Sequence, residues 1–385
     1  MKTAFFTDPH IGLVRAANTT SKSRELLREH LYDHTMATIA KIKDENPGIA
    51  IVCLGDLFDT YSNEERYVKQ GADIMRQCDI LLSGNHDMSN REDVIGSLQL
   101  LGSLGIERNT QASSALDNNL LINTEYDGSV HYARCIENRT LYTCISHTMT
   151  QALFEEALDT GIEFLAVNPE YASWNKLLLL HCNVGEPHDH DIRPDQTALW
   201  LLPDMQKKLL QSYDYILVGH EHVPRSFHQG RLLVLGNVYP IGFGEMADRF
   251  YYIFDSETKE ITSHRIVDIE KEFLTLTVDA ISGSDGKLEV THRMVQIEGR
   301  IKPQESAQVS RSIATFWKMN PYLFAVRPLI EIDNGTKVKV EKDGESSFLP
   351  RTLKSTVAES VKTTPFQAHF DEIVKELDSG AGTDD

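Results

Sequence analysis

The stretch "ILLSGNHD", residues 80–87, joins an apolar run to a glycine, an amide, an imidazole and a carboxylate. The run Ile80–Leu82 predicts a buried strand, and the glycine that follows it predicts a turn. A strand that runs into such a turn points small polar side chains out of the sheet edge, where a ligand can contact them. If other segments direct side chains to the same edge, the result is a binding site.

Four other segments have the same form, with carboxylate or imidazole side chains directly after an apolar run. They are "DPH" (8–10), "GDLFD" (55–59), "LLHCN" (179–183) and "GHEH" (219–222). Taken singly, each has an ordinary explanation, such as a surface turn or a core histidine. Five of them in one chain, each at the end of a strand-like run, are much harder to produce by chance and indicate one shared site.

Short strand-like runs alternate with helical stretches up to about residue 265, which predicts an α/β fold. The expected strands lie at 49–54, 140–146, 176–182, 213–219 and 231–236, and a clear helical pattern covers 63–77. Each strand-like run ends where a polar or glycine-containing turn begins.

Beyond about residue 266 the pattern changes. Residues 271–282 and 287–301 alternate in β fashion around the turn "GSDG", and 306–318 then predicts a helix, so we expect a small α+β domain. Residues 364–377 predict an amphipathic helix, which docks either on this protein or on a partner. The expected domains are 1–265, 266–345 and 346–385, the last ending in a disordered tail.

Composition restricts the class of protein. The 385 residues contain no run near the ~20 apolar residues of a membrane span, and the N-terminus turns polar too early for a signal peptide. The five scattered cysteines lack a CxxC pair, which favours reduced thiols over disulfides or a zinc-thiolate site. We therefore expect a cytoplasmic protein without a membrane partner.

The formal net charge of -19 is unfavourable for holding nucleic acid by its phosphates alone. A polyanionic substrate would have to be held by metal ions, a basic region or a partner protein.

The side chains at the five strand ends suit a pair of divalent metal ions. Carboxylate and amide oxygens mixed with imidazoles, without a thiolate, favour Mn²⁺, with Fe²⁺, Zn²⁺ or Mg²⁺ as alternatives. In "DPH" and "GHEH" the two ligands are two residues apart, so in an extended chain both would point to one side. Two cations about 3.5–4 Å apart can activate water against a phosphate ester.

The order D-x-H, GD-x-x-D, GNHD, H and GH-x-H resembles the calcineurin-like metallophosphoesterases across about residues 1–255. The resemblance implies two packed mixed β-sheets flanked by helices, with the site at one edge. It also implies the metal ligands: Asp8, His10 and His222 for the first metal, Asn85, His181 and His220 for the second, and Asp56 as the bridge.

The resemblance further implies that His86 is a catalytic residue, which protonates the leaving oxygen or stabilises the transition state, and that Asp59 orients it. His86 follows Asn85 directly, so its ring should project beside the metal pair. A carboxylate bonded to its other nitrogen would raise the pKa of His86 and fix its tautomer. The alternative role for Asp59 is a helix N-cap.

Two longer stretches narrow the resemblance. Residues 5–12 together with 55–65, and the closing segment 235–255, are similar to SbcD-type DNA repair and phage recombination nuclease subunits. The segment 266–345 would then be a capping domain. The last helix would dock on an ABC-type coiled-coil ATPase. The proline-rich continuation often found after "GDLFD" in that subfamily is absent here.

These observations lead to one main hypothesis and two others. The main hypothesis is a Mn²⁺-dependent DNA exonuclease or endonuclease subunit of an SbcCD-like repair or recombination complex. The subunit could also form a homodimer. The second keeps the chemistry but acts on a small phosphoester or a phosphoprotein. The third is a scaffold without turnover, which the complete set of ligands disfavours.

Overall fold

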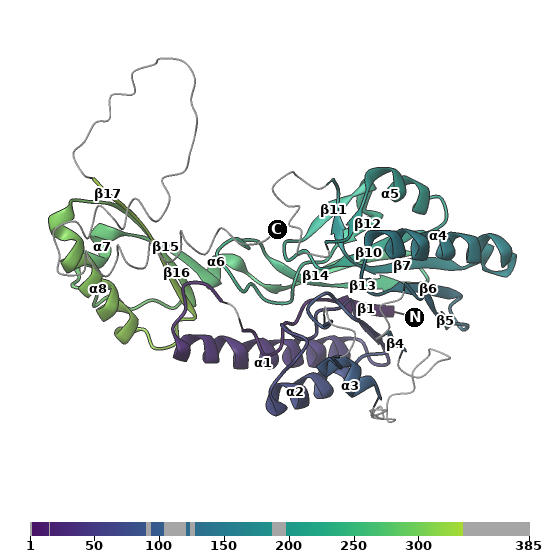
Figure 1. The fold of residues 1–385 in the computed structure, drawn as a ribbon, viewed down its shortest axis with the longest axis horizontal. Helices are drawn as coiled ribbons and strands as arrows, with labels where there is room; N and C mark the ends of the chain where they lie inside the picture. The colour runs from purple at the N-terminus through teal and green to yellow at the C-terminus, as the bar shows by residue number, and fades with distance from the viewer. Residues whose placement is uncertain are drawn as a thin grey trace, which may run out of the picture. The chain divides into compact units, whose positions relative to one another are not determined.

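Two six-stranded sheets lie face to face in the computed structural model (Figure 1). The structure describes residues 2–333, except for 15, 90–93, 104–120, 124–127 and 187–197. The first sheet has the order β14 (Glu260–Val267), β13 (Arg249–Asp255), β1 (Lys2–Phe6), β2 (Ala50–Cys53), β3 (Ile80–Leu82) and β4 (Leu121–Asn123). The second has the order β11 (Arg225–Phe227), β12 (Leu232–Val234), β10 (Tyr215–Gly219), β7 (Asn175–His181), β6 (Thr140–Ile145) and β5 (His131–Cys135).

Both sheets are mixed, which confirms the predicted class of fold. In the first sheet β1, β2, β3 and β4 are parallel, and β13 is antiparallel to β1. In the second, β6, β7, β10 and β12 are parallel, whereas β5 and β11 are antiparallel edge strands. The carboxyl ends of parallel strands meet at one edge of a sheet, and the five polar segments follow β1, β2, β3, β7 and β10.

Helices cover the outer face of each sheet (Figure 1). They are α1 (Ser21–Glu45), α2 (Glu65–Met75) and α3 (Ser97–Ser103) on the first sheet, and α4 (Gln151–Val167) and α5 (Pro203–Leu209) on the second. Short elements complete this part of the chain: β8 (Asn183–Val184), β9 (Trp200–Leu201), and the 3₁₀ turns Pro169–Ser173 and His228–Gly230.

The central strands of both sheets are apolar on both sides because both of their faces are buried. Phe5 packs between the two sheets, whereas its neighbours Ala4 and Phe6 face the layer of α1, α2 and α3. In the second sheet Leu177 and Leu179 face the inter-sheet core, and Leu178 faces α4 and α5. This alternation fixes the register of the central strands, since a slip of one residue would exchange the two faces.

The segment after β14 forms a small three-stranded sheet with three helices. Its elements are α6 (Ile269–Glu272), β15 (Phe273–Thr277), α7 (Val278–Gly283), β16 (Met294–Ile301), a 3₁₀ turn at Pro303–Glu305, α8 (Ser306–Met319) and β17 (Ala325–Ile332). The order is β15-β16-β17, and all three strands are parallel. The predicted helix at 306–318 is present as α8.

The β pattern predicted across the turn at 283–286 is wrong in part. The residues after Thr277 form the helix α7, so β15 and β16 are joined by a crossover and not by a hairpin. Thr277 Oγ1 accepts a hydrogen bond from Ala280 N at 3.2 Å and caps the helix. Val278 and Ile281, one helical turn apart, are both buried against the small sheet. Two apolar residues at helical spacing are too few to be recognised as a helix within the alternating pattern around them.

One apolar cluster joins this small sheet to the rest of the described chain. Leu27 and Leu31 of α1 pack in the same cluster as Phe273, Met294 and Phe324. The domain boundaries at 265 and 345 stay predictions, and the expected helix at 364–377 lies outside the described residues.

Within the described ranges, none of the helices is both long enough and apolar enough to cross a membrane. All five cysteines lie in the described part of the chain, where they are buried and form no disulfide.

Candidate metal centre

The loops that follow β1 and β2 run side by side and bring the first ligands together. Asp8 N donates to Gly55 O at 3.1 Å and His10 N donates to Asp56 O at 3.1 Å. These bonds continue the parallel pairing of β1 and β2 beyond the ends of the two strands. The register of the sheet core therefore sets the positions of the polar side chains at its edge.

Four of the predicted ligands have positive φ angles. The values are 54° for Asp8, 47° for His10, 49° for Asp56 and 87° for His220. The expectation that an extended chain places Asp8 and His10 on one side is therefore wrong, since both have left-handed backbone. Such conformations cost about 1–3 kcal/mol each and concentrate at functional sites, where the surrounding structure enforces them.

The glycine of "GNHD" is needed because the backbone of one loop touches the side chains of the others. A Cβ at Gly84 would lie 2.5 Å from Asp56 N and 2.6 Å from His181 Nε2, and would also collide with the Asp56 carboxylate. Gly55 has a φ of 109°, which side chains rarely permit, and its Cβ would collide with the His181 ring.

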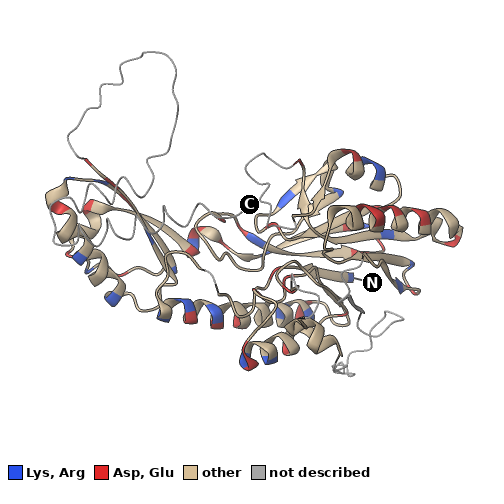
Figure 2. Cartoon of the chain, viewed as in Figure 1, with Lys and Arg blue, Asp and Glu red and all other residues tan. Residues whose placement is uncertain are grey.

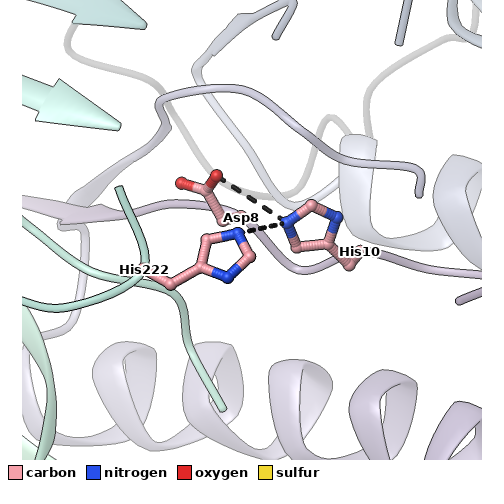
Figure 3. Close-up of side chains that lie close together, drawn as sticks. All are labelled: Asp8, His10 and His222. Carbon is pink, nitrogen blue, oxygen red and sulfur yellow. Dashed lines mark hydrogen bonds and ion pairs between the residues drawn. The ribbon is translucent and has the colours of Figure 1, made fainter. Parts of the chain in front are cut away.

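Asp8, His10 and His222 form the first group of candidate ligands (Figure 3). His10 Nε2 lies 3.0 Å from His222 Nε2 and 3.8 Å from Asp8 Oδ1. Asp8 Oδ1 is buried without a hydrogen-bond partner among the described residues. A buried carboxylate oxygen that faces two imidazole nitrogens fits a cation bound between the three side chains.

Asn85, His181 and His220 form the second group. Asn85 Oδ1 lies 3.2 Å from His181 Nε2 and 2.7 Å from His220 Nδ1. His181 Nδ1 faces the backbone oxygen of Leu54 at 2.7 Å, which leaves Nε2 for the centre. Burial and the neighbouring His181 hold the pKa of His220 well below its usual value, which favours the neutral imidazole.

Asp56 lies between the two groups, as the predicted bridge requires. Its Oδ2 atom is 3.3 Å from His181 Nε2 and 4.0 Å from His10 Nε2. Burial opposes its charge, but His181, His86 and His10 together hold the pKa of Asp56 well below its usual value. Burial likewise opposes the charge on His181, and the Asp56 carboxylate outweighs it and raises the pKa of His181 to about 9.

His86 lies beside the two groups, and the structure corrects the way in which Asp59 contacts it. His86 Nδ1 is 2.7 Å from the backbone oxygen of Asp59, while the Asp59 carboxylate accepts from Val14 N at 2.7 Å and lies 3.3 Å from His10 Nδ1. Burial lowers the pKa of His86, but the charge of Asp56 and the bond to the Asp59 carbonyl raise it overall. The expected carboxylate contact is therefore replaced by a carbonyl, which still fixes the tautomer.

Asp87, the last residue of "GNHD", fastens its loop to the loop after β2. Its carboxylate accepts from Gly84 N at 2.9 Å, from Leu57 N at 3.2 Å and from Phe58 N at 2.9 Å. Burial and the charge of Asp56 raise the pKa of Asp87 to about 7. The sequence placed Asp87 in the motif without predicting this structural role.

The sequence also gave no separate role to two other residues that support the centre. Glu221, between His220 and His222, accepts from Val184 N at 2.6 Å and ties the "GHEH" loop to β8. His147, after β6, is buried with its ring 6.3 Å from the His181 ring, and its backbone N donates to Ser83 O at 3.0 Å. Both depend on contacts between distant segments, which motif spacing does not report.

The chemistry of the donors fits two divalent cations. Asp8, His10 and His222 would hold one, Asn85, His181 and His220 the other, with Asp56 between them. The ligand atoms of Asp8, His10 and His222 lie within 4.8 Å of one another. The same holds for Asp56, His181 and His220. Cys182 packs on the far side, in the core with α4 and α5, so the centre contains no thiolate.

A comparison with protein-family models agrees with this chemistry. The sequence model of the calcineurin-like phosphoesterase family matches residues 1–224. A calcineurin-like phosphoesterase from Bacillus subtilis, YfkN, matches at 13% identity with a TM-score of 0.36 over 83% of this chain and 97% of its own. The NAD nucleotidase NadN of Haemophilus influenzae matches at 11% identity with a TM-score of 0.35 over 69% of this chain and 49% of its own.

These two structural similarities are remote, and the assignment depends on the family match and on the complete set of ligands. A metal-dependent hydrolase of phosphoester bonds is what that family and these side chains specify. The chain belongs to the calcineurin-like phosphoesterase family.

Proposed function

We propose that the chain is a Mn²⁺-dependent phosphodiesterase that cleaves DNA as the nuclease subunit of an SbcCD-like complex. The observation that carries the proposal is the meeting of two ligand groups around Asp56, with His86 beside them. When bound, the two cations would neutralise phosphate oxygens and supply an activated water. The chain itself must then orient the ester and provide a proton for the leaving oxygen.

His86 is placed for that proton transfer. Its backbone N donates to Asp56 Oδ1 at 2.9 Å, and its Nδ1 is held by the Asp59 carbonyl at 2.7 Å. Since Nδ1 carries the proton that is donated to a carbonyl, a protonated ring presents Nε2–H as the acid. General acid catalysis requires the protonated ring, and the contact between His86 Nδ1 and the Asp59 carbonyl favours that form.

DNA is proposed as the substrate because of features outside the centre. The segments 5–12, 55–65 and 235–255 are similar to those of SbcD-type nuclease subunits, and the small sheet β15-β16-β17 follows them where a capping domain is expected. The sheet packs through Phe273 and Phe324 in the cluster that also contains Leu13, five residues after Asp8.

The charge of the chain supports a partner that contributes DNA affinity. The net charge is -19, and α4 carries four acidic residues without a Lys or Arg (Figure 2). Such a surface repels a polyanion, so the subunit by itself should bind duplex DNA weakly. A coiled-coil ATPase encoded nearby is the partner we propose.

The test is cleavage of linear duplex, single-stranded and hairpin DNA with Mn²⁺ or with EDTA, in the presence and absence of that ATPase. Mn²⁺-dependent cleavage that the ATPase increases would support the proposal. A small chromogenic phosphodiester, assayed in parallel, reports whether the centre itself is active. Rapid hydrolysis of this probe without cleavage of any DNA form would refute the DNA substrate but not the two-metal centre.

The same acidic surface favours a second candidate, a phosphoesterase for a small molecule or a phosphoprotein. A compact substrate needs no extended basic surface, because the metal pair alone can neutralise one phosphate group. This hypothesis predicts faster turnover of phosphomonoesters or small diesters than of DNA. The ATPase should not change the rate.

A further inference from the structure

The segment that connects β12 to β13 contains a carboxylate that the proposed reaction does not use. Glu245 Oε1 lies 2.7 Å from Nδ1 of His222, one of the three ligands of the first group. The Glu245 side chain is 15% exposed. It belongs to the "FGE" turn of the closing segment.

The geometry points to Glu245 as a positioning residue that sets the affinity of the first metal site through His222. A histidine that donates Nδ1–H to a carboxylate presents the lone pair of Nε2 to a metal. His222 Nε2 faces His10 Nε2 at 3.0 Å, which is the side of the ring on which the first cation would lie. The inference depends on the metal centre and is independent of the substrate.

Glu245 is itself held so that it cannot turn away from His222. Its other oxygen, Oε2, accepts from Asn237 Nδ2 at 3.0 Å, from Ile241 N at 3.0 Å and from Arg249 Nη2 at 3.2 Å. Four donors on one carboxylate, counting His222, stabilise its ionised form.

Arg249 anchors this arrangement in the sheet. Its side chain is fully buried at the start of β13, where the pairing with β14 is irregular. Its Nε donates to Asn237 Oδ1 at 2.5 Å and its Nη2 to the Glu245 backbone oxygen at 2.9 Å. Asn237 N in turn donates to His222 O at 3.2 Å. The loop that carries His222 and the turn that carries Glu245 are thus tied at two points.

The two metal sites differ in this respect. His181, in the second group, faces a neutral carbonyl, that of Leu54, through its Nδ1 atom. The Nδ1 atom of His220 lies 2.7 Å from the candidate ligand Asn85 and so faces the centre itself. His222 is oriented by a charged group, and hydrogen bonds to charged acceptors are about twice as strong as neutral ones. Removal of the Glu245 charge should therefore weaken the first site and leave the second unchanged.

The experiment is a titration of the metal-free full chain with Mn²⁺. Calorimetry measures the heat of binding, and the EPR signal of the free ion measures how much Mn²⁺ remains unbound. In the Glu245→Gln variant we expect the affinity of one site to fall about 10–100-fold, with the other site as in wild type. Glu272→Gln is the control, since Glu272 is a half-buried carboxylate that bonds to Tyr239 at 2.5 Å and not to a metal-ligand candidate. It should bind Mn²⁺ like wild type.

A double-mutant cycle separates positioning from general support of the fold. If Glu245 acts through His222, Glu245→Gln should cause no further loss of affinity in a His222→Ala background. Additive losses, wild-type affinity in the single variant, or equal weakening of both sites would overturn the inference.

If the Glu245→Gln variant does not fold, NMR of the wild-type protein loaded with Zn²⁺ still tests the inference, because it reports which nitrogen of His222 binds the metal. A hydrogen-bonded Nδ1–H of His222, with Nε2 on the metal, is the expected result. Coordination through Nδ1 would overturn it.

Discussion

Around the candidate metal centre, the backbone of Gly55 and Gly84 lies too close to neighbouring side chains for a Cβ to fit. The five strand ends, and so every predicted ligand, could be found from the sequence because an apolar run followed by a polar turn marks the edge of a sheet. The left-handed backbone at Asp8, His10 and Asp56 could not, because the pairing of two loops imposes it. The carbonyl contact between Asp59 and His86 was missed for the same reason.

Gly84→Ala tests the tight packing around the bridging carboxylate. The new methyl group would collide with the Asp56 side chain and lie 2.6 Å from His181 Nε2, so one or both must move. We expect bound Mn²⁺ to fall from two per chain to one or fewer, and phosphodiester hydrolysis to fall at least about 100-fold, since small displacements at such sites are costly. Gly283→Ala is the control, because its Cβ would meet open space. Normal metal content in Gly84→Ala would contradict the geometry.

His86→Ala tests the proposed general acid. His86 belongs to neither proposed ligand group, so both metals should remain bound, while kcat should fall about 10²–10⁴-fold. Metal analysis and steady-state kinetics on a diester with a poor leaving group measure the two effects. For a diester whose leaving group needs no proton, such as nitrophenolate, kcat should fall much less. Unchanged turnover of the poor leaving group would remove His86 from the mechanism.

At the scale of elements, the junction between α1 and the small sheet contains two histidines that the motifs do not include. His30 and His34, one helical turn apart, pack against Tyr239, and His30 also packs against Phe324. The strands β15 and β16 and the helix α8 were predicted in outline, whereas α7, β17 and this junction were not. Periodicity identifies an element from its own residues, but the packing of one element on another depends on residues far away in the chain.

These histidines should make the protein less stable in acid. Burial and the nearby Arg293 lower the pKa of His30 to about 3, and burial lowers that of His34 to about 4. Both pKa values lie below the unfolded value, so the unfolded chain binds more protons between pH 6.5 and about 4, and stability falls as the pH falls through this window. At pH 5 the low pKa of His30 should reduce the free energy of unfolding by about 2 kcal/mol.

Urea unfolding of wild type and His30→Leu at pH 7 and pH 5 measures this effect. The difference in free energy of unfolding between the two pH values should be smaller in the variant, whose other titrating groups are the same. An equal loss of stability in both proteins would show that His30 titrates normally in the fold.

At the scale of the whole molecule, five loops from two sheets must be held together around a cluster of carboxylates and imidazoles. Bound cations should therefore stabilise the folded state. Mn²⁺ at 100 times its Kd adds about 2.7 kcal/mol for each site that only the native state forms. We expect Tm to rise by several degrees on addition of Mn²⁺ and to return on addition of EDTA. Asp56→Ala, which lacks the shared ligand, should show little of this shift, and an equal shift there would place the ions elsewhere.

The family of the whole chain could be predicted from the order of its motifs, but its substrate could not. The motifs report only the side chains that surround the phosphate. DNA or a small ester would be selected by surfaces whose charge and shape arise from many residues, and by a partner encoded elsewhere. The acidic α4 in Figure 2 illustrates this limit, since it is compatible with an ATPase-assisted nuclease and with a small-molecule enzyme.

The most direct measurement is an anomalous-scattering map from crystals of the full chain grown with Mn²⁺. We predict two peaks about 3.5–4 Å apart. One should be bound by Asp8, His10 and His222, the other by Asn85, His181 and His220, and both by Asp56. A single peak, or two peaks that share no Asp56 oxygen, would contradict the two-metal centre on which the proposed chemistry depends.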